Sequence, residues 1–387
     1  LADVHGFCRH NASQTQAIDI MTDKQKAMQL DPQAQSSARP EGDGFFSVGV
    51  VGNYADSDET RFLLTPEASG LICSSGIRLV MEADAGIDIS FTNEAYAGFG
   101  VEIGTREQAL KCDIVLSYAP LRQFDILKMR PGATLLCMMD NTLFEKEVTT
   151  ALLEHKITLG CLDNMVSHND IPVFADIIDE LDGRASIMYA QDRLSFLGGG
   201  KGVILAGVAG LNPCEVLIIG DGNVECAAAN AALDAGAYVT LMNNDISALQ
   251  SARLACGPGL NTAAIHPRVL FNKVKTADVI LLGNCTRQFE MPKKLSVAMK
   301  ENVYILDFNE THPSVTVPRT VAMALSNVLV NFFDEMLLKN GFDGMLATTP
   351  GVQSGIVTYN GNLVDKLVAA YLSMPSVDLG MILAGSN

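Results

Sequence analysis

The sequence EVLIIGDGNVECAAANAALDAGAYVTLMN, residues 215–243, decides the fold class of this chain. The apolar run at each end predicts a buried strand, the alanine-rich middle predicts a helix, and Gly220 and Gly222 predict a tight turn after the first strand. This order is that of a Rossmann-like fold, because glycines in the turn let backbone N–H groups approach a pyrophosphate at the start of the helix. We therefore expect Gly220 and Gly222 to face a dinucleotide.

Two positions depart from that pattern. Glu225 stands where a third glycine would let the helix pack closely on the strand, and Asn243 stands where an acidic side chain would hydrogen-bond the ribose. A neutral amide makes hydrogen bonds about half as strong as charge-assisted ones. No lysine or arginine neighbours Asn243 in the sequence, so a phosphorylated dinucleotide is not indicated. We expect NAD as the cofactor, bound through a weakened site that includes Asn243.

The rest of the chain alternates between apolar runs and helical patterns. Thr65 is the expected N-cap of a helix with Pro66 in its first turn, and a long helix is expected over residues 174–197. Strands are expected at residues 45–51, 78–81, 94–99, 114–116, 134–138, 158–161 and 303–308. Such alternation is typical of a parallel sheet covered by helices, and ~150 residues per domain suggests two α/β domains in a chain of 387 residues.

Composition narrows the classes of function. The formal net charge of −17 argues against a general binder of nucleic acid or anionic membranes, and no apolar run approaches the ~18 residues of a membrane span. The nine cysteines are scattered without a CxxC pair or a Cys/His cluster, which indicates a reducing compartment and no metal site. No signal-peptide pattern opens the sequence. We expect a cytoplasmic protein that recognises a small molecule, with residues 1–44 as a polar, flexible tail.

Several short stretches carry a resemblance that covers nearly the whole chain from Val48 onward. They occur in this order: RFLLTPE at residues 61–67, then residues 82–86, 95–100, 130–132, 199–213 and 216–222, then VPRT at 317–320 and ALSN at 324–327. In these stretches the chain resembles the alanine dehydrogenase and pyridine-nucleotide transhydrogenase family. The resemblance implies a Rossmann-like domain at residues 186–309, inserted into a substrate domain at residues 45–185 and 310–387. It also implies a homo-oligomer, as a dimer or a hexamer.

The resemblance also assigns positions in a substrate site. The arginine that holds the substrate carboxylate in the family matches Arg61, whose planar guanidinium suits a carboxylate; an ion pair on the surface is the alternative. The family's second basic residue, a lysine, is replaced within Ser117-Tyr118-Ala119-Pro120, and its catalytic histidine falls on Asp140. An aspartate beside Arg61 would stay ionised and pair with it.

Other candidate residues depart from the family in a similar way. Asp179 stands in place of a cofactor-facing serine, where its carboxylate would repel a pyrophosphate. Glu310 and His312 stand where a catalytic aspartate should follow a strand, and the C-terminal ends of parallel strands are where α/β sites form. A turn cap is the alternative for His312. His168, on a polar loop, is a further candidate general base, with a solvated loop histidine as the alternative.

Two classes of function stay open at this point. The first is an NAD-linked oxidoreductase that acts on a small 2-amino or 2-oxo acid. In it Arg61 holds the carboxylate, and the acid–base set is drawn from Asp140, His168, Glu310 and His312. The second is a catalytically silent relative that binds a ligand or serves in assembly. Ancestry favours the first class, and the substituted site residues favour the second.

Overall fold

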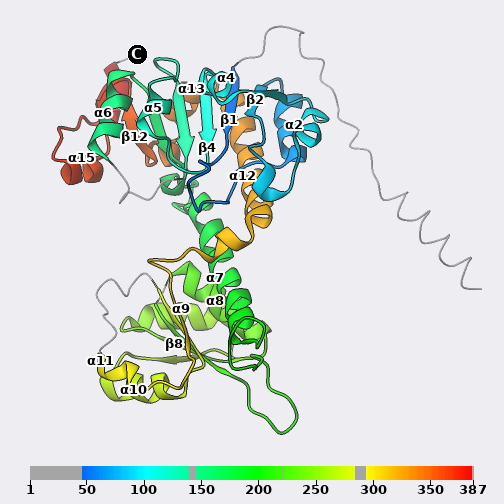
Figure 1. Cartoon of the computed structure of the whole chain (residues 1–387). Coiled ribbons are helices and arrows are strands. Elements are labelled where there is room, and N and C mark those ends of the chain that lie inside the picture. Colours follow the sequence, from blue (N-terminus) through cyan, green and yellow to red (C-terminus); the bar gives the residue numbers. More distant parts are fainter. Residues whose placement is uncertain (1–45, 139–144, 221, 284–292, 386–387) are drawn as a thin grey trace, which may run out of the picture. The chain divides into compact units, whose positions relative to one another are not determined.

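Figure 1 shows the computed structural model of the chain, which describes residues 46–138, 145–220, 222–283 and 293–385. The expected N-terminal tail, residues 1–44, lies outside these ranges. The described strands form two sheets, one of eight strands and one of five, and helices follow most of the strands. The α/β class expected from the alternating sequence is confirmed.

The larger sheet is mixed. Its strands are β1 (Ser47–Val51), β2 (Arg78–Glu82), β3 (Glu102–Gly104), β4 (Ile114–Ser117), β5 (Thr134–Cys137), β6 (Thr158–Cys161), β12 (Ile356–Tyr359) and β13 (Asn362–Leu363). In space they run β13-β12-β6-β5-β4-β1-β2-β3, with parallel pairing from β3 to β6 and antiparallel pairing of β12 with β6 and β13. The chain therefore leaves this sheet after β6 and returns to it near its C-terminal end.

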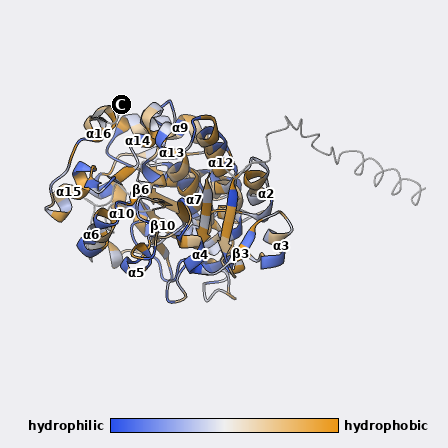
Figure 2. Cartoon of the chain, turned by 90° about the horizontal axis from the view of Figure 1, so that it is seen from above, coloured by the Kyte–Doolittle hydropathy of each residue, from blue (hydrophilic) through white to orange (hydrophobic). Residues whose placement is uncertain are grey.

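Side chains of the larger sheet alternate between two hydrophobic cores. Val48 and Val50 of β1 lie in one core and Val51 lies in the other, as the two-residue period of a strand requires. The helices of this part are α2 (Pro66–Ser74), α3 (Asn93–Ala97), α4 (Arg106–Leu110), α5 (Gln123–Ile126), α6 (Lys146–Glu154), α12 (Pro318–Leu338), α13 (Phe342–Thr348), α14 (Pro350–Gln353), α15 (Lys366–Leu372) and α16 (Leu379–Gly385). Helices α2 and α12 contribute to the first core, and α4, α5, α6 and α15 contribute to the second. In Figure 2 the strands at the centre of the view are largely orange, whereas α4 and α6 carry blue, hydrophilic segments.

Helix α12 is the one described helix that is long and apolar enough, by length and composition, to cross a membrane. The core helix of a soluble protein satisfies the same criteria. The inward side chains of α12, among them Leu325, Leu329 and Phe333, are buried in the first core. A packing role in that core accounts for the apolar composition of this helix.

The smaller sheet is entirely parallel. Its strands are β7 (Glu215–Ile219), β8 (Tyr238–Met242), β9 (Asn261–Ala263), β10 (Val279–Leu282) and β11 (Tyr304–Asp307), with helices α8 (Asn223–Asp234), α9 (Ile246–Cys256), α10 (Pro267–Thr276) and α11 (Lys293–Ser296). The spatial order is β11-β10-β7-β8-β9, so the direction of winding reverses between β7 and β10. This is the Rossmann-like arrangement expected from residues 215–243, and ligands of such sheets bind where the winding reverses.

Sequence-based expectations for single elements were right at some positions and wrong at one. The side chain of Thr65 accepts a hydrogen bond from the Ala68 N–H and caps α2 as expected. The long helix expected over residues 174–197 is α7, Val173–Leu194. The strand expected at residues 94–99 is wrong, because this stretch begins with helix α3. The side chain of Thr92 caps that helix, so a capping hydroxyl outweighs the strand preference of the aromatic residues.

Helices α7 and α8 pack closely at a single glycine. A Cβ added to Gly183 of α7 would lie 2.3 Å from the carbonyl oxygen of Val224 and 2.7 Å from the N of Ala228, both backbone atoms in the first half of α8. Backbone atoms of a helix cannot move away from an added methyl group as the end of a flexible side chain can. The close approach of the two helices therefore depends on the absence of a side chain at Gly183.

We predict that Gly183→Ala destabilises the protein by ~1–3 kcal/mol or more, because it overpacks this contact. The same change in an open helix would stabilise by about 1 kcal/mol, so the sign of the effect is informative. Urea unfolding measures the difference, with Met188→Ala, an exposed position on the same helix, as the control. A Gly183→Ala protein as stable as the wild type would refute the close contact.

Candidate functional site

Arg61 is buried, 8% exposed, in the loop that follows β1. Its guanidinium donates to both carboxylate oxygens of Glu59, from Nε to Oε1 at 2.8 Å and from Nη2 to Oε2 at 2.6 Å. Burial by itself would lower the pKa of Arg61, but the hydrogen bonds to Glu59 outweigh it, and the pKa is raised. Arg61 is thus a permanent cation. The ion pair considered as its alternative role exists, but it is buried.

A short 3₁₀ turn, η5 (Pro313–Thr316), joins Arg61 to helix α7. The Ser314 hydroxyl accepts a hydrogen bond from Nη1 of Arg61 at 3.1 Å, and the Ser314 N–H donates to Oδ1 of Asp182 at 2.7 Å. His312 Nδ1 lies 3.3 Å from Oδ2 of the same buried Asp182. This hydrogen bond raises the pKa of His312 above 6.5. The structure therefore brings two of the candidate residues, Arg61 and His312, into one network.

Tyr118 lies directly after β4, in the segment where the resemblance expects a lysine. Its ring centroid lies 4.8 Å from the Arg61 guanidinium carbon, in a cation–π contact, and the side chain is buried. Burial raises the pKa of the Tyr118 hydroxyl well above 10, so it stays protonated. Tyr118, Glu59, Ser314 and Asp182 were not among the candidate residues from sequence. Only Glu59, two residues before Arg61, carried a local signal, since a carboxylate so near can fold back onto the guanidinium.

The remaining acid–base candidates lie elsewhere. Asp140 lies outside the described residues, so its expected pairing with Arg61 stays a prediction, and the carboxylate that the structure pairs with Arg61 is Glu59. His168 is exposed and lines a separate cavity of about 200 Å³, among residues of α7, α12 and α14. Glu310 is exposed just after β11. Among the described residues, no hydrogen bond or ion pair joins the side chain of His168 or Glu310 to the network of Arg61 and His312.

The glycine-rich turn after β7 holds a buried carboxylate. Glu225, the third residue of α8, is 0% exposed, and its side chain turns back toward the loops. A Cβ added to Gly220 or Gly222 would lie 2.3 or 2.7 Å from a Glu225 carboxylate oxygen, and one added to Gly283, just after β10, would lie 1.4 Å from Oε1. The cofactor candidates Gly220 and Gly222 therefore stand where expected, at the end of β7, with the carboxylate of Glu225 against them.

Asn243 follows β8, as the sequence predicted. Its side chain is buried, and its Oδ1 accepts a hydrogen bond from the Asp245 N–H at 2.6 Å. Asp245 is the N-cap of helix α9. That acceptor is thus engaged by the backbone of the chain itself. A ribose hydroxyl at this position would compete with the N–H of Asp245.

Asp179 lies on α7, one helical turn before Gly183, and is half-buried. Its burial, together with the negative charges of surrounding carboxylates, raises its pKa to about 7; these carboxylates are Asp182, Asp176, Glu225 and Asp163. The carboxyl group therefore keeps its proton up to near-neutral pH. The repulsion of a pyrophosphate expected from Asp179 applies above that pH.

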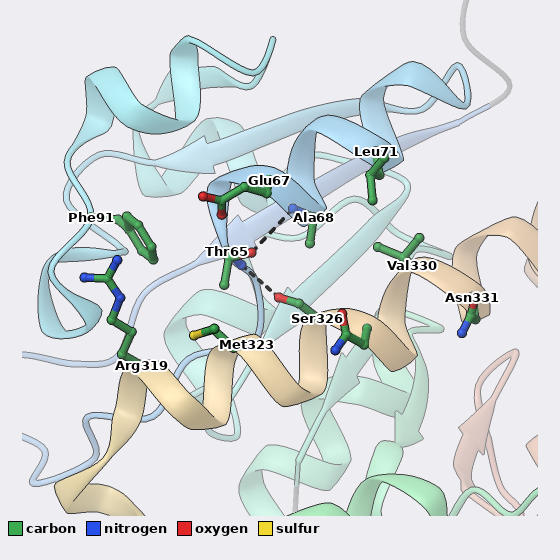
Figure 3. Close-up of a pocket in the computed structure, with 11 residues that line it drawn as sticks. Thr65, Glu67, Ala68, Leu71, Phe91, Arg319, Met323, Ser326, Val330 and Asn331 are labelled. Atoms are coloured by element: carbon green, nitrogen blue, oxygen red, sulfur yellow. Dashed lines mark hydrogen bonds between the residues drawn. The ribbon is translucent and has the colours of Figure 1, made fainter. Parts of the chain in front are cut away.

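Figure 3 shows a further groove, which lies between α2 and α12. Its volume is about 560 Å³, with apolar side chains of Leu71, Met323 and Val330 in its lining. Arg319 lies over the ring of Phe91 at 4.2 Å at one end of the groove. None of the candidate site residues that the structure describes lines it.

We predict that the pKa of His312, followed by NMR of the imidazole, lies above 6.5 and falls in Asp182→Asn. The raised pKa means that the His312–Asp182 contact stabilises the fold fully below about pH 6.5, and that this contribution is lost as pH rises through the pKa of the folded state. Asp192→Asn, an exposed change on the same helix, is the control and should leave the His312 titration where it was. An unchanged titration in Asp182→Asn would contradict the assigned partner.

Asp179, whose pKa is also raised, generates a second prediction in a more acidic range of pH. Between about pH 4 and pH 7 the folded state holds a proton that the unfolded state has lost, so the free energy of unfolding falls as pH rises. Asp179→Asn removes this effect, and should be more stable than the wild type at pH 8 by on the order of 1 kcal/mol or more, with a smaller gain at pH 4. Chemical unfolding at both pH values measures it. Equal differences at the two pH values, as expected for the Asp192→Asn control, would contradict the raised pKa.

Comparison with protein families gives two matches along the chain. The model for the alanine dehydrogenase/PNT N-terminal domain matches residues 50–177, and the model for the alanine dehydrogenase/PNT C-terminal domain matches residues 186–286. Together they cover more than half of the chain. The second match includes β7, α8 and β10, the elements that carry the glycine turn, and implies an NAD(P)-binding type of fold.

Individual relatives agree with these matches. The chain is 25% identical over 348 residues to an alanine dehydrogenase of Bacillus subtilis, covering 81% of this chain and 91% of that protein. It is 24% identical over 364 residues to an alanine dehydrogenase of Mycolicibacterium smegmatis, covering 85% and 97%. Among solved structures, an L-alanine dehydrogenase shares the fold with a TM-score of 0.74 and 21% identity, covering 84% of this chain and 99% of that one. A transhydrogenase from Sinorhizobium meliloti has a TM-score of 0.65 and 16% identity, covering 82% and 99%. The chain is a distant member of the alanine dehydrogenase/PNT family.

Proposed function

We propose that this chain is an oxidoreductase-type protein that binds a small carboxylate, of the 2-amino or 2-oxo acid class, at Arg61. The observation that supports this proposal is the hydrogen bonding of the buried Arg61 guanidinium. A guanidinium has five N–H groups, and the bonds between described residues use three of them, two to Glu59 and one to Ser314. The described residues therefore leave two of its N–H groups unused, and a planar guanidinium with two such groups suits a ligand carboxylate.

The Glu59 carboxylate sets the strength of this binding. Because Glu59 already balances the charge of Arg61, an arriving carboxylate meets a neutral pair and places a second negative charge within a few ångströms of the first. In the family a lysine would add a second cation and offset this repulsion between carboxylates. The corresponding segment of this chain contains Tyr118 and no lysine. We therefore propose weak binding of carboxylates in the wild-type protein.

His312 is the acid–base group that we propose for this site. It lies in the same network as Arg61 through Asp182 and Ser314, and the hydrogen bond to Asp182 raises its pKa above 6.5. Histidine is the side chain whose ordinary pKa lies nearest to neutral pH, which suits it to general acid–base catalysis. Tyr118 is unsuited to this role, because burial raises the pKa of its hydroxyl well above 10. NAD is the dinucleotide that we propose for the Rossmann-like part, bound weakly because Asn243 and Glu225 replace the usual residues.

A catalytically silent relative, which binds a ligand or serves in assembly, is the second candidate. The observation that favours it is that the chain's own carboxylate, Glu59, occupies one whole edge of the Arg61 guanidinium. Turnover separates the two candidates, since only the first transfers a hydride. Under either candidate we propose a cytoplasmic homo-oligomer whose ligand is a small carboxylate, without nucleic-acid or membrane partners.

Removal of the Glu59 charge provides the direct test of carboxylate binding. We predict that Glu59→Gln binds pyruvate or alanine at least ~10-fold more tightly than the wild type, about 1.4 kcal/mol, in calorimetric titrations. Glu67→Gln, an exposed change on α2, is the matched control and should have no effect. The added affinity should disappear in the double variant Glu59→Gln/Arg61→Gln. Equal carboxylate binding in Glu59→Gln and the wild type would remove Arg61 as the anchor.

Alanine turnover tests the family's usual reaction. With pyruvate, ammonia and NADH we expect no NADH oxidation above background, because positioned acid–base groups each contribute ~10²–10⁴-fold and the usual lysine and histidine are replaced. The alanine dehydrogenase of Bacillus subtilis, assayed in parallel, provides the positive control. Steady NADH oxidation that vanishes in Arg61→Ala would contradict this expectation and favour the full dehydrogenase activity.

A further inference from the structure

The carboxylate of Glu225 lies in a cradle made by three glycines of two loops. Gly220 and Gly222 belong to the turn between β7 and α8, and Gly283 follows β10, the neighbouring strand. The two loops are joined by a hydrogen bond from the Gly283 N–H to the Ile219 carbonyl at 2.8 Å. The Glu225 carboxylate approaches all three glycines so closely that a Cβ on any of them would lie within 2.7 Å of it.

This cradle is where a dinucleotide would bind. It lies at the C-terminal ends of β7 and β10, where the winding of the sheet reverses, and it adjoins the N-terminal end of α8. Glycines at such a turn let a backbone approach a pyrophosphate, and the partial positive charge of the helix N-terminus attracts an anion. A carboxylate has the charge and the oxygen acceptors that this position favours.

We propose that Glu225 is a built-in occupant of the pyrophosphate position, so that this one side chain controls whether a dinucleotide can enter the Rossmann-like part of the chain. The proposal rests on the weak NAD binding put forward above and names the group responsible for it. A pyrophosphate must displace a carboxylate that is 0% exposed, or lie beside it as a second anion. Both the volume and the charge of the Glu225 carboxylate therefore weaken binding of the dinucleotide, whereas the absence of a third glycine would act only on packing.

A double-mutant cycle tests the geometry without any ligand. We expect Gly283→Ala to lower the midpoint of thermal unfolding by on the order of 5 °C or more, because the new methyl group would overlap Oε1 of Glu225. In the Glu225→Ala background the same change should cost a small fraction of that shift. Equal shifts in the two backgrounds would show that the carboxylate does not fill the cradle, and would overturn the proposal.

Binding of NADH tests the blocking role. We expect Glu225→Ala and Glu225→Gly to bind NADH at least ~10-fold more tightly than the wild type, measured by calorimetry and by nicotinamide fluorescence. Glu301→Ala, an exposed change that removes the same charge, is the control and should bind as the wild type does. Either tight NADH binding by the wild type, or no gain in both Glu225 variants once the cycle has shown coupling, would overturn the proposal. Failure of carboxylate binding at Arg61 would leave these results unaffected, so the two proposals fail separately.

Discussion

The ion pair between Arg61 and Glu59 is the interaction on which the geometry of the candidate site depends. A buried cation is costly unless its charge and its N–H groups are satisfied, and three separate segments meet this need. Glu59 provides the charge, Ser314 a hydroxyl and Tyr118 an aromatic face. These contacts hold the loop after β1 against the end of β4 and against η5. Charge balance within the chain, without any ligand, therefore sets the shape of the site.

The same principle appears in the Rossmann-like part. There an anion from the chain, the carboxylate of Glu225, lies against glycines whose usual partner in such folds is a pyrophosphate. In both places a carboxylate of the chain itself lies where we propose that a ligand oxygen would otherwise bind.

The sequence predicted the fold well because the decisive signals are local. The apolar runs around Gly220, the capping hydroxyl of Thr65 and the position of Arg61 after β1 each depend on a few neighbouring residues. The partners of the site residues could not be predicted in the same way. Asp182 meets Ser314 through the tertiary fold, and the direction of the Glu225 side chain depends on a loop that follows a different strand.

The claim that the chain supplies its own anions is tested most directly by crystals of the wild-type protein soaked in NADH at a concentration near the dissociation constant of the Glu225→Ala variant. We expect electron density for the Glu225 carboxylate among Gly220, Gly222 and Gly283, with no pyrophosphate between these glycines. Density for a pyrophosphate in that cradle, with the Glu225 side chain turned away from it, would contradict the account.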